Sequence, residues 1–163
     1  MSTPRSRFHT LLIFWGPVLL WMVLIFFLSH QDKDQSRQTS EWVLAILNFL
    51  QLDRVALEAW HLPFLIRKAA HFTEYAILSL LIWRGWKGYF RVIPPWWAPV
   101  LGCFLYACTD EFHQSFVPGR GAAFTDVLID TSGALVAMVL LWGWRKWREK
   151  TRGQVMSSNP GIN

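Results

Sequence analysis

The chain has 163 residues, of which 53% are hydrophobic and only 17% are charged. Its 11 tryptophans and 12 phenylalanines stand largely in long apolar runs, a composition that excludes an ordinary soluble domain and is typical of an integral membrane protein. The net charge of +5 comes from basic residues that flank these runs, so the positive-inside bias of membrane proteins explains it and no nucleic-acid partner is expected.

Four apolar segments of helical length predict a single all-α domain over residues 1–163, a four-helix transmembrane bundle. The expected spans cover about residues 10–29, 68–88, 92–109 and 125–144. A cleaved signal peptide is the competing interpretation of the first segment. No small-x-small cleavage site follows it, so we favour an uncleaved span.

The connections between the spans carry further predictions. Residues 41–66 hold apolar stretches that are too short to cross a membrane, and their flanking tryptophans and charges favour short interfacial helices, with caps of the bundle as an open alternative. Pro118-Gly119-Arg120, between spans three and four, predicts a tight turn or a re-entrant loop. Gly133 is expected to be a helix-contact residue.

The distribution of basic residues predicts the orientation. Four spans place both termini and the turn at 84–91 on one side, which holds one acidic residue, Glu149. The basic residues of that side are Arg5, Arg7, Arg84, Lys87, Arg91, Arg145, Lys146, Arg148, Lys150 and Arg152. The other side holds six basic and ten acidic residues, so both termini and a basic tail at 145–163 should be cytoplasmic.

This topology brings the start of span two, the end of span three and the start of span four to one outer face. Polar residues at membrane depth are expensive and are kept when they are paired, hydrated or used. The candidate catalytic residues at this face are His71, Glu74, Asp110, Glu111 and His113. The candidate substrate-binding residues are Lys68, Tyr75, Gln114, Arg120, Asp126 and Asp130. The sequence therefore predicts one outward-facing polar pocket.

The first chemistry open to this pocket is metal binding. His71 with Glu74, and Asp110 with His113, stand three residues apart, a spacing that presents two ligands from one helix face. Two histidines and two carboxylates would suit zinc or manganese. The residue types identify no other cofactor.

Two interpretations need no metal. In one, a histidine is the general acid or base, a carboxylate orients it, and Lys68 and Arg120 bind an anionic group such as a phosphate. In the other, the network only stabilises the fold: Arg120 pairs with Asp126 or Glu111, and Lys68 pairs with Glu74.

The combined motifs resemble those of the VanZ-like family over roughly residues 10–142. They are Lys68-x-x-His71-x-x-Glu74-Tyr75, Thr109-Asp110-Glu111-x-His113-Gln114, Pro118-Gly119-Arg120 and Asp126-x-x-x-Asp130, with Ser29-x-Gln31 as a weaker match. The resemblance implies a small multi-span protein of the bacterial inner membrane. It also implies a link to lowered susceptibility to the glycopeptide antibiotic teicoplanin, the property associated with the name-giving member.

The expected function is binding or modification, in the bilayer, of an anionic cell-envelope lipid or lipid-linked precursor at the outward-facing pocket. Two alternatives are open: a non-catalytic membrane module that acts through a protein partner, and a small transporter. The absence of an internal repeat weighs against the transporter.

Overall fold

The computed structural model of the chain describes residues 7–30, 62–117 and 123–158. These residues form four helices, α1 (Arg7–Ser29), α4 (Leu62–Phe90), α5 (Trp97–Gln114) and α6 (Phe124–Ser158), and no strand. The predicted all-α fold is confirmed for this part of the chain. Most of the predicted interfacial segment and the turn at Arg120 lie outside the described residues.

The helices begin and end at positions that their residues explain. Arg91, directly after α4, has a φ of 58°, a left-handed conformation that ends a helix. Pro94 and Pro95 follow, and because proline disfavours helical conformation in the residue before it, α5 begins only at Trp97. α5 then continues through Gln114, so the acidic motif that was expected after a span is part of a helix. α6 likewise continues into the predicted basic tail.

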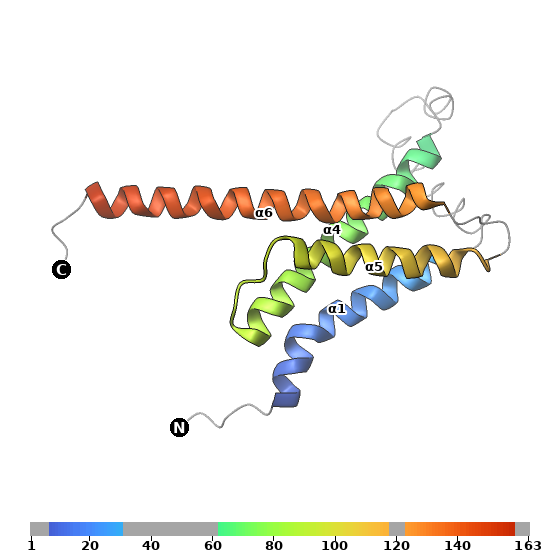
Figure 1. Cartoon of the computed structure of the whole chain (residues 1–163), viewed down its shortest axis with the longest axis horizontal. Coiled ribbons are helices and arrows are strands. Elements are labelled where there is room, and N and C mark those ends of the chain that lie inside the picture. Colours follow the sequence, from blue (N-terminus) through green and yellow to red (C-terminus); the bar gives the residue numbers. More distant parts are fainter. Residues whose placement is uncertain (1–6, 31–61, 118–122, 159–163) are drawn as a thin grey trace, which may run out of the picture.

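Successive helices run in opposite directions, so the ends of α1 and α5 lie beside the starts of α4 and α6 (Figure 1). α4 and α5 each contact the three other helices, and α4 packs most extensively, above all against α6 and α1. The shared core is mostly aliphatic and small: Val18, Ile25, Leu78, Cys103, Ala107, Val127 and Ala134, with the ring of Tyr75.

Two glycines let helices approach backbone to backbone. A Cβ atom on Gly133 of α6 would lie 2.1 Å from the carbonyl oxygen of Phe72 in α4, and one on Gly85 would lie 2.9 Å from that of Phe14 in α1. Small residues serve membrane helices in this way, because lipid tails provide no hydrophobic force to press the helices together. Gly133 is thus confirmed as a helix-contact residue.

The outer surface of the bundle is apolar. α1 and the Phe124–Gly153 part of α6 are long and apolar enough to cross a membrane, and only 11% of the most apolar window of α1 is buried. Leu20 and Phe27 of α1 and Leu140 of α6 are each about two-thirds exposed or more. The central helix of a soluble protein would bury such residues, whereas a lipid environment covers them.

Candidate functional site

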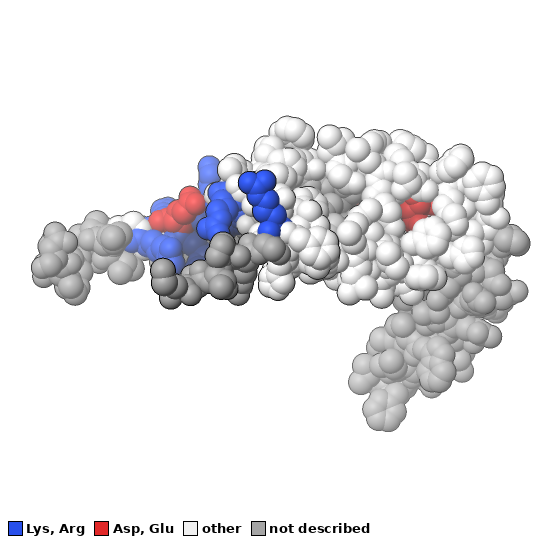
Figure 2. Space-filling view, turned by 90° about the horizontal axis from the view of Figure 1, so that it is seen from below, with Lys and Arg blue, Asp and Glu red and all other residues white. Residues whose placement is uncertain are grey.

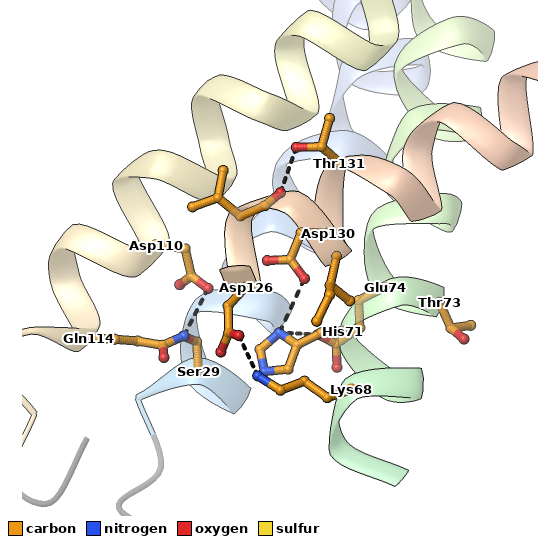
Figure 3. Close-up of polar contacts among 12 residues, drawn as sticks. Ser29, Lys68, His71, Thr73, Glu74, Asp110, Gln114, Asp126, Asp130 and Thr131 are labelled. Atoms are coloured by element: carbon orange, nitrogen blue, oxygen red, sulfur yellow. Dashed lines mark hydrogen bonds and ion pairs between the residues drawn. The ribbon is translucent and has the colours of Figure 1, made fainter. Parts of the chain in front are cut away.

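An ion pair joins the second turn of α4 to the first turn of α6 at the site end of the bundle. Lys68 Nζ of α4 contacts Asp126 Oδ1 of α6, and the two side chains are 19% and 20% exposed (Figure 3). The alternative in which Lys68 pairs with Glu74 is therefore wrong. The cause is the packing of α4 against α6, which places Asp126 closer to the ammonium group than the carboxylate on its own helix.

His71 lies one turn further into the bundle, between two carboxylates. Its Nδ1 is 3.8 Å from Glu74 Oε2 on the same helix and 3.7 Å from Asp130 Oδ1 on α6 (Figure 3). The Asp130 side chain is 1% exposed and that of Glu74 is 16% exposed. A histidine between two largely buried carboxylates is well placed to accept and return a proton.

A second chain of contacts connects α5 with the end of α1. Gln114 Nε2 donates to Ser29 Oγ over 2.5 Å and to Asp110 Oδ2 over 3.3 Å. All three side chains are buried. Ser29 is a site residue that the sequence reasoning missed, although its place in the weak Ser29-x-Gln31 motif was a signal for it.

Glu111 fixes the start of α6. Its Oε2 accepts a hydrogen bond of 2.9 Å from the backbone N–H of Ala123, the residue before α6 begins. Residues 118–122, which include Arg120, lie outside the described residues. Both residues that flank them belong to the site region, because Val117 follows the end of α5 and Ala123 is bound to Glu111.

The described part of the site brings five carboxyl groups together with one of the predicted cations. Asp130 interacts electrostatically with all four of the other carboxylates, Glu74, Asp110, Glu111 and Asp126, which shows that the five form one cluster. Of the two predicted cations, Lys68 and Arg120, only Lys68 lies within the described residues. Its ammonium group already forms an ion pair with Asp126. Tyr75 is fully buried beside this cluster, and its hydroxyl has no hydrogen-bond partner among the described residues.

His113 does not join His71. Its ring lies 4.5 Å from the ring of Phe26 and 5.2 Å from that of His30, measured between centroids, at the end of α1. Within the described ranges, no group of three or more His, Cys, Asp or Glu side chains is arranged to hold a metal ion. The predicted ligand set of His71, Glu74, Asp110 and His113 therefore does not fit one metal ion in this arrangement.

The described cavities lie elsewhere. Three cavities with volumes of about 310, 320 and 280 Å³ are lined by residues of the tryptophan-rich end of the bundle, and none is lined by a residue of the predicted site. The predicted outward-facing pocket is not among these three cavities, and within the described residues the site is a cluster of buried and half-buried side chains at the helix ends.

Two helices that are long and apolar enough to cross a membrane, together with a buried acidic cluster where antiparallel helices end, are features of one class, the helical membrane proteins. A family model described as VanZ/LLP1 matches residues 14–145, and the chain belongs to this VanZ-LLP1 family. Comparison with curated proteins gives no significant match, and neither does comparison with solved structures.

Proposed function

We propose that the protein crosses the bacterial inner membrane four times, with both termini in the cytoplasm, and that its acidic cluster faces the cell envelope. The asymmetry of charge supports this orientation. Lys and Arg gather around the C-terminal part of α6, at the end of the molecule opposite the cluster (Figure 2). Cytoplasmic ends of membrane helices carry such an excess of Lys and Arg.

At that outer face the protein binds, and acts on, an anionic cell-envelope lipid or lipid-linked precursor. The observation that carries this proposal is the position of His71, 3.8 Å and 3.7 Å from two carboxylates and one helical turn from Lys68. His71 would transfer the proton, and Glu74 and Asp130 would orient the ring and stabilise its charged form.

The anionic headgroup would replace Asp126 as the partner of Lys68. Lys68 retains an exposed fraction of 19%, so a ligand from the membrane surface can reach its ammonium group. Arg120 would supply the second cation, because Ala123, three residues after it, is hydrogen-bonded to Glu111 of the cluster. Two cations would offset the repulsion between a phosphate and the ionised carboxyl groups of the cluster.

Binding of a polyprenyl phosphate to purified protein, measured by native mass spectrometry, tests the cation pair. We expect Lys68→Ala and Arg120→Ala to weaken binding by about 10-fold each, the effect of losing one charge-assisted hydrogen bond. Arg84→Ala, which removes a positive charge from the opposite end of α4, is the matched control. Full affinity in both site variants would reject the anionic ligand.

The proton-transfer role is tested with the two histidines. His71→Gln should lower turnover of the bound lipid phosphate, followed by mass spectrometry of the products, by about 100-fold or more while leaving its binding intact. His113→Gln should retain turnover, because that ring packs against Phe26 and His30. In cells, the same His71→Gln change should abolish any reduction of teicoplanin susceptibility that the wild-type protein confers.

A non-catalytic membrane module is the second candidate, and the closed contacts of the cluster favour it. Lys68, Glu111 and Gln114 each have a partner within the protein, as in a network that serves stability alone. If the protein is such a module, His71→Gln and Glu74→Gln variants that fold normally should have the same effect on cells as the wild-type protein. An enzyme would lose this effect. The small transporter remains a further alternative, and it should leave the lipid chemically unchanged.

A further inference from the structure

The three cavities at the basic end of the bundle adjoin one another along α6. The first cavity shares Trp96, Met138 and Trp142 with the second. It also shares Trp83, Leu141 and Arg145 with the third. Together they form one groove between α6, the end of α4 and the connection from α4 to α5.

The chemistry of this groove changes along its length. Its inner part is lined by apolar and aromatic side chains only, from Trp96, Leu135, Met138, Val139 and Trp142. Its outer part is rich in cations: Lys87, Arg145, Lys146, Arg148 and Arg152. Glu149 is the one acidic residue among the lining residues, so the outer part keeps a positive charge.

Tryptophan rings hold several of the cations at the wall of the groove. Lys87 Nζ and Arg145 Cζ, from α4 and α6, lie 5.0 Å and 5.4 Å from the ring centroid of Trp83. Lys146 Nζ lies 4.4 Å from that of Trp142. Indole rings favour the boundary between hydrocarbon and headgroups, and they fix the flexible cationic side chains at that depth.

We propose that this groove binds one anionic glycerophospholipid of the leaflet on the basic side of the membrane. The phosphate lies between Arg145 and Lys146, and an acyl chain covers Leu135 and Val139, which are 41% and 56% exposed. Charge complementarity selects an anionic headgroup, and the apolar inner part selects a ligand with a hydrocarbon chain rather than free phosphate. Basic pockets between membrane helices bind acidic lipids in this way.

This inference uses different residues from the outward-facing site, and it shares with that proposal only the membrane-spanning arrangement. The lipid has a structural consequence as well. It would join α6 to the connection between α4 and α5, because Ile93, Pro94 and Trp96 line the same groove.

The test is native mass spectrometry of the full-length protein, stripped of lipid in neutral detergent and titrated with phosphatidylglycerol. The double variant Arg145→Gln/Lys146→Gln should bind phosphatidylglycerol about 30-fold more weakly. Each cation near a lipid headgroup contributes about fivefold in affinity, and the two factors multiply. The matched control, Arg84→Gln/Lys150→Gln, removes the same charge from residues that line none of the three cavities, and it should bind within twofold of wild type. Val139→Trp should fill the exposed apolar part of the groove. It should weaken binding by about fourfold for each methylene group of the acyl chain that the indole ring displaces.

Phosphatidylcholine with the same acyl chains and glycerol phosphate without chains complete the design. The proposal is supported if both bind at least 10-fold more weakly than phosphatidylglycerol. Equal binding of phosphatidylcholine would show that the groove binds lipids without selecting the headgroup. Equal binding of glycerol phosphate would show that the groove binds soluble anions and does not need an acyl chain. An equal loss in the control variant would show bulk charge attraction. Each of these three results overturns the proposal, and none bears on Lys68 or Arg120.

Discussion

Replacement of Gly133 by alanine tests the packing that assembles the site. The added Cβ would lie 2.1 Å from the carbonyl oxygen, 2.9 Å from the carbonyl carbon and 3.1 Å from the Cα of Phe72. All three atoms belong to the backbone, so no change of rotamer can relieve the contact. α4 and α6 would have to separate by more than about 1 Å, because ordinary van der Waals contact begins at 3.4 Å.

The expected cost follows from this separation. Overpacking a close contact destabilises a protein by about 1–3 kcal/mol, while alanine gains about 1 kcal/mol over glycine inside a helix. Gly143→Ala on the same helix provides the control, because a Cβ there meets nothing within 4 Å. Since both variants share the gain in helix propensity, the difference between them isolates the packing term of about 1–3 kcal/mol.

The separation of α4 and α6 would also change the site, because Phe72 follows His71 and Gly133 lies three residues after Asp130. The distance of 3.7 Å from His71 Nδ1 to Asp130 Oδ1 would lengthen with the separation of the helices. Thermal unfolding in one detergent, followed by circular dichroism, should show Gly133→Ala melting several degrees below Gly143→Ala. Equal melting temperatures would refute the close approach of α4 and α6.

Two further predictions concern the contacts of the cluster. Lys68→Met alone should destabilise the protein more than Lys68→Met/Asp126→Asn, because the single change removes the ammonium group that pairs with Asp126. A double-mutant cycle of unfolding free energies should give a coupling of about 1 kcal/mol between the two residues. Zero coupling would mean that the pair does not form in the membrane. Gln114→Leu should cost about 1–3 kcal/mol, since it removes the hydrogen bonds that Gln114 donates to the buried Ser29 and Asp110, whereas Ser29→Ala should cost about 1 kcal/mol. If the costs of these two changes simply add in the double variant, the hydrogen bond between the residues is not present.

The sequence was sufficient to predict the helices and the end of the bundle at which the polar residues meet. Apolar runs of helical length predict helices, and antiparallel order then brings the start of α4, the end of α5 and the start of α6 together. The residues at which the helices begin and end were harder to predict from the sequence. The end of the third span was predicted too early, at residue 109, because a hydropathy pattern ends at the first charges even where the backbone continues as a helix. Only the three-residue spacing of Asp110 and His113 indicated that the helix continues.

The partners within the cluster could not be predicted. Which carboxylate Lys68 meets depends on the rotation of α4 and α6 about their own axes, and the close contact at Gly133 sets that rotation. The separation of His113 from His71 has the same origin, because α5 turns His113 toward Phe26 of α1 and toward His30, the residue after that helix. Spacing along one helix shows which side chains share a face, but not which helix that face contacts.

The proposed function depends most directly on the side of the membrane that each end of the bundle faces. Single cysteines at Ser115 and Lys150, two exposed positions at the site end and the basic end, can be labelled in intact cells with a membrane-impermeant maleimide, in a background where Cys103 and Cys108 are alanine. We expect Ser115→Cys to be labelled from outside and Lys150→Cys to be labelled only after the membrane is opened. Labelling of Lys150→Cys alone in intact cells, or of both positions, would contradict an acidic cluster that faces the envelope and a basic end that faces the cytoplasm.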